Sequence, residues 1–115
     1  MNIGNQGRAG SINREFSFTE DSSAGRTTYF TLKGHVGLHE ASVMESELEN
    51  AARPGNNRII INMSSVKSFS SAGIRVILAM YKKLKNTGGK LQICNPSENV
   101  RNVIGLTALD ELLIK

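Results

Sequence analysis

Apolar residues recur at helical spacing over one long stretch of this chain. From Ile74, apolar side chains follow at positions 77, 78, 81 and 84. This period of 3.6 residues predicts an amphipathic helix that begins at Ser70 or Ser71. We expect the helix to end at Thr87-Gly88-Gly89, because glycine readily adopts the left-handed conformation found at helix C-termini.

Runs of β-branched and aromatic residues predict four strands, at Glu15–Thr19, Thr27–Leu32, Arg58–Asn62 and Lys90–Cys94. The isoleucine run in the third segment indicates burial on both faces, as in a central parallel strand. The polar stretch Glu20–Arg26 predicts a turn, so the first two strands should form an antiparallel hairpin. We expect Gly34 to end the second strand.

Two further helices and a last strand complete the expected order of elements. A helix over His39–Ala52 carries an apolar stripe, formed by Ala41, Met44, Leu48 and Ala51. A short helix should begin at Asn95-Pro96-Ser97, turn Val100, Val103 and Ile104 inward and stop at Gly105. Leu109–Ile114 is a candidate edge strand.

The alternation of strands and helices predicts an α/β fold. We expect a small mixed β-sheet that opens with the antiparallel hairpin and continues with parallel strands joined by right-handed crossovers. Three helices are too few to cover both faces well, so we place them mainly on one face.

Composition narrows the possible functions. The 115 residues suit one domain, and we interpret residues 1–13, rich in Gly, Asn and Ser, as a flexible tail ahead of a domain over residues 14–115. A net charge of +4, scattered along the chain, does not indicate a nucleic-acid partner. One cysteine and the lack of a signal peptide or a membrane-length apolar run predict a cytoplasmic protein that is not inserted in a membrane.

Other candidate chemistry is sparse. His35 and His39 have a spacing seen in metal sites, but no third ligand is evident, so we expect no metal and no cofactor. Ser22-Ser23-Ala24-Gly25-Arg26 precedes a strand rather than a helix, which indicates a turn. Cys94 is interpreted as a small buried apolar residue. No paired carboxylates or Ser–His arrangement suggests an enzyme.

The junction of the isoleucine-rich strand and the long helix carries two hydroxyl groups, those of Ser70 and Ser71. A helix N-terminus offers free backbone N–H groups and the positive end of the helix dipole, which together stabilise a phosphate. The residues therefore suit a serine switch. They also suit a plain N-cap, because serine is favoured at that position.

Several segments in this order resemble the STAS domain of bacterial anti-sigma factor antagonists, over roughly residues 16–115. These segments are Thr31-Leu32-Lys33-Gly34, Arg58-Ile59-Ile60-Ile61-Asn62, Ser70-Ser71-Ala72-Gly73-Ile74, Val76-Ile77-Leu78 and Gly88-Gly89-Lys90-Leu91. The family's motif reads Asp, a phosphorylated Ser or Thr, a small residue, Gly and Leu. The resemblance therefore makes Ser71 the phosphoacceptor, and the sequence departs from the motif at Ser70, which takes the place of Asp.

The resemblance implies partner switching. The unphosphorylated protein would bind an anti-sigma factor serine kinase, phosphorylation of Ser71 would release it, and a serine phosphatase would reset the switch. We expect the partner surface to surround Ser71 and to include Ser70, Ala72, Gly73, Arg75, Val76 and Met80. Val76 and Met80 are placed on the shoulder of the helix, between core and solvent. The alternative is a STAS module that is never phosphorylated and serves as a constitutive subunit of a transporter or sensory complex.

Overall fold

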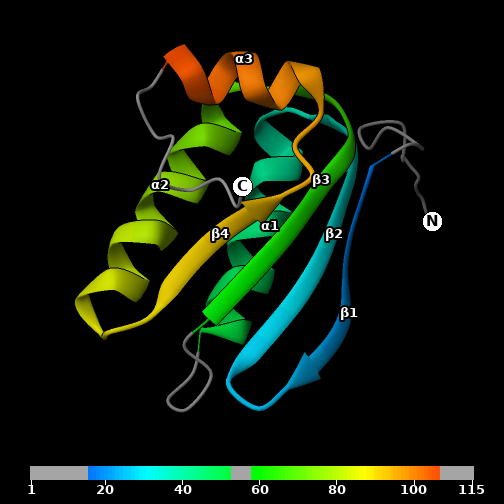
Figure 1. The fold of residues 1–115 in the computed structure, drawn as a ribbon. Coiled ribbons are helices and arrows are strands. Elements are labelled where there is room, and N and C mark those ends of the chain that lie inside the picture. The colour runs from blue at the N-terminus through cyan, green and yellow to red at the C-terminus, as the bar shows by residue number, and fades with distance from the viewer. Residues whose placement is uncertain (1–15, 53–57, 107–115) are drawn as a thin grey trace, which may run out of the picture.

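The computed structural model describes residues 16–52 and 58–106, which form a mixed sheet with three helices (Figure 1). The strands are β1 (Ser17–Ala24), β2 (Thr27–Val36), β3 (Arg58–Phe69) and β4 (Lys90–Cys94). The helices are α1 (Leu38–Ala51), α2 (Ser71–Asn86) and α3 (Glu98–Leu106). The predicted α/β class with an N-terminal hairpin is confirmed.

The strands lie in the order β1-β2-β3-β4, with β1 antiparallel to β2 and the other neighbours parallel. Two successive right-handed crossovers that advance in the same direction place their helices on the same face of a sheet. Accordingly α1 and α2 lie side by side behind the sheet in Figure 1, while α3 crosses one end. The expectation that the helices gather mainly on one face holds for α1 and α2.

The first hairpin is longer than the sequence predicts. Residues 20–24, expected in a turn, continue β1, and the turn is only Gly25-Arg26. Gly25 has φ +63°, as the first position of a two-residue hairpin turn can require. The expectation was wrong because β1 is an edge strand whose described residues 19–23 are all exposed, so its sequence lacks the apolar alternation of a buried strand.

Two central strands also extend beyond their predicted ends. Gly34 does not end β2; it lies inside the strand with φ +90°, beside an irregularity in the pairing with β3. β3 runs seven residues past Asn62 to Phe69, and its later buried residues are Met63, Val66 and Phe69. Their spacing of three follows the shifts of register between β2 and β3, and this spacing hides the strand from a search for simple alternation.

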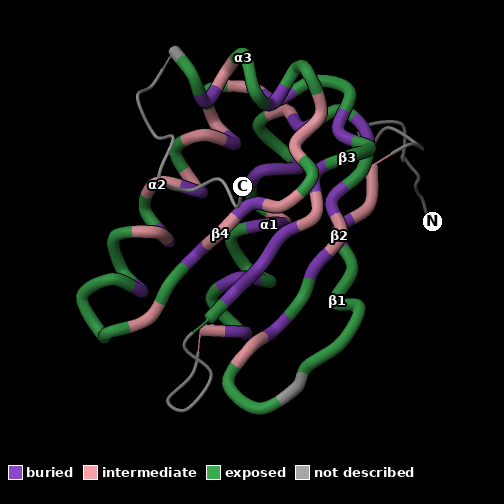
Figure 2. Tube along the Cα trace, in the orientation of Figure 1, coloured by how far each residue is buried: buried purple, intermediate pink, exposed green. Residues whose placement is uncertain are grey.

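The core lies between the sheet and the two paired helices, as the buried residues in Figure 2 show. The predicted stripe of α1 is buried at all four positions, Ala41, Met44, Leu48 and Ala51. In α3, Val100 and Ile104 are buried and Val103 is half-buried, as expected. Gly105 does not stop this helix, which continues to Leu106. The tail over residues 1–13, the boundary at residue 14 and the strand Leu109–Ile114 lie outside the described residues and stay predictions.

Candidate functional site

Ser70 is the N-cap of α2. Its backbone is extended, and its hydroxyl accepts a hydrogen bond from the backbone N–H of Gly73 at 3.3 Å. Its own N–H donates to the carbonyl of Val36 at 3.0 Å, which ties the start of α2 to the end of β2. Of the two serines that the sequence left open as the cap, the structure selects Ser70.

Ser71 is the first residue of α2 and is exposed. Because Ser70 supplies the cap, the Ser71 hydroxyl is not needed for that purpose. It stands at the positive end of the helix dipole, where an added dianion is stabilised by free N–H groups. The structure therefore assigns the cap to Ser70 and leaves Ser71 exposed at the first position of the helix.

Gly73 is buried and allows α2 to approach the sheet closely. A Cβ atom at this position would lie 2.9 Å from Cε1 of Phe69 and 3.1 Å from Cγ1 of Val36. Carbon atoms pack best at about 3.5–4.0 Å, so even alanine would crowd this contact. Gly73 is buried, so it does not lie on the exposed partner surface on which the sequence analysis placed it.

The structure corrects the expected position of Met80. Only 3% of this residue is exposed, and it belongs to the hydrophobic core rather than to the shoulder of α2. It lies three residues after Ile77 and four before Leu84, so the buried stripe of α2 runs through these residues. Val76 is half-buried and Arg75 is exposed, as expected. Of the two apolar shoulder candidates, only Val76 reaches the surface.

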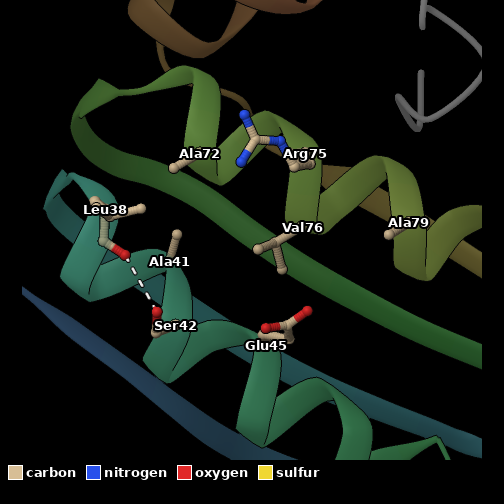
Figure 3. Close-up of a pocket in the computed structure, with 8 residues that line it drawn as sticks. All are labelled: Leu38, Ala41, Ser42, Glu45, Ala72, Arg75, Val76 and Ala79. Carbon is tan, nitrogen blue, oxygen red and sulfur yellow. Dashed lines mark hydrogen bonds between the residues drawn. The ribbon is translucent and has the colours of Figure 1, made fainter.

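A groove of about 290 Å³ lies between α1 and α2 (Figure 3), and one of its lining residues, Ala72, directly follows Ser71. From α2 it is lined by Ala72, Arg75, Val76 and Ala79. From α1 it is lined by Leu38, Ala41, Ser42 and Glu45. Three of the residues that the sequence analysis placed around Ser71, namely Ala72, Arg75 and Val76, are therefore brought together in one hollow.

Sequence reasoning missed the α1 side of this groove. Leu38 is the first residue of α1 and is 74% exposed, which is unusual for a leucine of a helix that packs on a core. It precedes the buried Ala41 by three residues, so the pattern alone would place it beside the core stripe. Its position at the start of the helix was the one signal in the sequence that could have indicated its exposure, because the first turn of a helix can extend past the edge of the sheet.

One polar contact involves a histidine that the sequence analysis considered as a metal ligand. Nδ1 of His35 lies 2.8 Å from Oγ of Ser68, on neighbouring strands. Within residues 16–52 and 58–106, no three His, Cys, Asp or Glu side chains gather in a way that could hold a metal ion. Burial raises the pKa of the Cys94 thiol, and a hydrogen bond to the backbone of the same residue opposes this shift in part. No helix in the described part of the chain is long and apolar enough to cross a bilayer.

Comparison with known families settles the classification. The sequence profile of the STAS domain matches residues 20–115, which is most of the chain. The chain belongs to the STAS domain family. The resemblance drawn from the motifs around Ser71 is thereby confirmed at the level of the family.

Curated relatives of this STAS domain carry names of one kind. The putative anti-sigma factor antagonist BtrV of Bordetella bronchiseptica is 32% identical over 66% of this chain and 66% of its own length. A putative anti-sigma factor antagonist of Thermotoga maritima is 34% identical over 51% of this chain and 52% of its own length. The chain therefore spans between half and two thirds of the length of these relatives.

Solved STAS structures share the fold. The anti-sigma factor antagonist SpoIIAA in its unphosphorylated form superposes with a TM-score of 0.77 at 22% identity, over 85% of this chain and 86% of that one. The phosphorylated form of SpoIIAA gives a TM-score of 0.73 at 20% identity, over 85% and 89% of the two chains. At this level of identity the likeness establishes the arrangement of strands and helices.

Proposed function

We propose that this STAS domain is an anti-sigma factor antagonist that binds an anti-sigma factor serine kinase and is released when Ser71 is phosphorylated. The observation that carries the proposal is that the two serines at the start of α2 have different structural positions. Ser70 caps the helix, and Ser71 presents a hydroxyl at the surface that the cap does not use. The names of the curated relatives and the solved phosphorylated form of SpoIIAA support the same function.

The departure from the family motif at Ser70 is compatible with this switch. Asp and Ser are both strong N-cap residues, because each offers a side-chain oxygen to the free N–H groups of the first turn. The hydroxyl of Ser70 makes this hydrogen bond to Gly73. The capping function thus survives the replacement.

Phosphorylation would change the surface without requiring a new fold. A phosphate brings about −1.5 to −2 charges at neutral pH. At Ser71 it would meet the positive end of α2, and Arg75 lies one helical turn further on. These favourable terms exist within the free protein. A partner packed against the same spot would face an unpaired dianion, so phosphorylation should release it.

The partner-binding surface that we propose consists of the residues around Ser71 that reach the surface. It includes Ser70, Ala72, Arg75 and Val76. Gly73 contributes by letting α2 pack closely, and Met80 is excluded because it is buried. The protein acts by binding, and a serine phosphatase returns it to the competent state.

The test uses purified protein and each anti-sigma factor serine kinase encoded in the same genome. We expect one kinase to bind the unmodified protein and, with ATP, to phosphorylate Ser71, as peptide mass spectrometry would show. Ser71→Ala should bind and stay unmodified. Ser70→Ala is the matched control, and it should still be phosphorylated at the neighbouring residue.

The alternative, a STAS module that is never phosphorylated, predicts a different result. If no kinase modifies Ser71 and Ser71→Asp binds every partner as well as the wild type, the domain is a constitutive STAS module. That outcome would refute the switch. Phosphate found only on Ser70 or Ser23 would refute the assignment of the acceptor.

A further inference from the structure

We propose that the groove between α1 and α2 receives an apolar side chain of an amphipathic segment of the anti-sigma factor, with Leu38 as the main contact. The segment should carry a basic residue on the α1 side and an acidic residue on the α2 side. This inference rests on the proposed function and specifies which surface, beyond the serines, holds the partner.

Small side chains create the hollow. Three of the lining residues are alanines, Ala41 on α1 and Ala72 and Ala79 on α2, so the two helices leave space between them (Figure 3). Further along the pair the gap is bridged, because Nζ of Lys83 lies 2.8 Å from a carboxylate oxygen of Glu49. A volume of about 290 Å³ is at the lower end of the range of small-molecule pockets, and it suits one or two inserted side chains.

Apolar side chains lie at the opening of the groove, where an apolar side chain of the partner would enter. Leu38 is 74% exposed and, with Tyr29, is one of two large apolar side chains in the described residues that are classed as exposed. Val76 is half-buried on the opposite wall. Exposed apolar groups that line a hollow often mark an interface, whereas isolated ones on a flat surface need no such explanation.

Opposite charges on the two sides of the groove would set the orientation of a bound segment. Glu45 stands on the α1 side and Arg75 on the α2 side (Figure 3). Within the described residues neither forms an ion pair, so both remain available to a partner. A segment with an apolar residue between a base and an acid is complementary to this pattern, and an amphipathic helix laid in a groove is a common way to supply it.

The groove is coupled to the switch by position. Ala72, which lines one end, directly follows Ser71. A phosphate on Ser71 would therefore lie beside Arg75, compete for its guanidinium and repel the acidic residue of the partner. The same geometry explains both why the partner binds here and why phosphorylation would release it.

The experiment measures the affinity of the kinase identified above for three variants by calorimetry. Leu38→Asp should weaken binding about a hundredfold, the loss typical of a central contact residue. An acidic residue in the first turn is compatible with the helix dipole, so circular dichroism and the melting temperature should stay close to wild type. Arg75→Glu should weaken binding about tenfold or more, because it reverses a charge that faces the partner.

Tyr29→Ala is the matched control. Tyr29 is 40% exposed and follows Thr28 and precedes Phe30, both buried, so it points to the opposite face of the sheet from the helices. It should bind within about twofold of wild type, as expected for a residue outside an interface. If folded Leu38→Asp also binds within about twofold, the groove is not the docking surface, even where Ser71 phosphorylation still releases the kinase. If no kinase binds the wild type, the proposed function fails and the groove proposal fails with it.

Discussion

Replacing Gly73 with alanine should destabilise the domain, although alanine is the better helix former. The new Cβ would lie 2.9 Å from Cε1 of Phe69 and 3.1 Å from Cγ1 of Val36. Both neighbours are buried in the core, with 6% and 1% exposure, so neither can move without disturbing further contacts. Overpacking of this kind costs about 1–3 kcal/mol.

The gain in helix propensity opposes that cost. Glycine to alanine is worth up to about 1 kcal/mol in a helix interior, and less near the N-terminus. The net expectation for Gly73→Ala is a loss of about 1 kcal/mol, which lowers the melting temperature of a domain of this size by roughly 4–5 °C. Urea unfolding followed by circular dichroism provides the free energy.

Gly105→Ala is the matched control, since Gly105 also lies in a helix but, among the described residues outside its own helix backbone, its added Cβ would meet no atom within 4 Å. This variant should gain stability, by about 0.5–1 kcal/mol. The two variants should therefore change the free energy of unfolding in opposite directions. A Gly73→Ala protein as stable as wild type would show that α2 does not need this close approach, and that the serines are positioned by other contacts.

Four further expectations concern single side chains. Ser70→Ala should cost about 1 kcal/mol of unfolding free energy through the lost cap, and Ser70→Asp should not; equal losses in urea titrations would contradict the capping role. Met80→Ala should cost about 2–5 kcal/mol because it opens a cavity in the core, and a loss below 1 kcal/mol would show that Met80 is exposed after all. Lys83→Ala should change stability by less than about 1 kcal/mol, because the pair with Glu49 is roughly half exposed. Cys94 should react with iodoacetamide more slowly than a free thiol at the same pH, because burial raises the pKa of its thiol and leaves less thiolate. The free energy of unfolding should fall as the pH rises above the ordinary thiol pKa, because there only the unfolded thiol ionises. A pH profile of alkylation that matches a free thiol would refute the raised pKa.

For the candidate site, the sequence predicts the start of α2 correctly but places the centre of its buried face at the wrong position around the helix axis. The sequence places the start of α2 within a residue and assigns the two serines to it, because capping residues and an apolar period are local properties. It centres the apolar face incorrectly, because Ile74, Leu78 and Tyr81 form a second apolar row beside the true one. In the structure these three residues are half-buried, while Ile77, Met80 and Leu84 are buried.

What the sequence determines by itself is the set of elements and the position of Ser70 and Ser71 between a strand and a helix. What the tertiary structure decides is which side of each element meets another. Met80 is buried because α1 and α2 share one face of the sheet and pack against each other there, whereas Leu38, the first residue of α1, is exposed. Likewise β3 extends to Phe69 because β2 continues beside it to Val36, a pairing between segments more than thirty residues apart. Burial and pairing of this kind are set by contacts between distant segments, and a local pattern does not contain them.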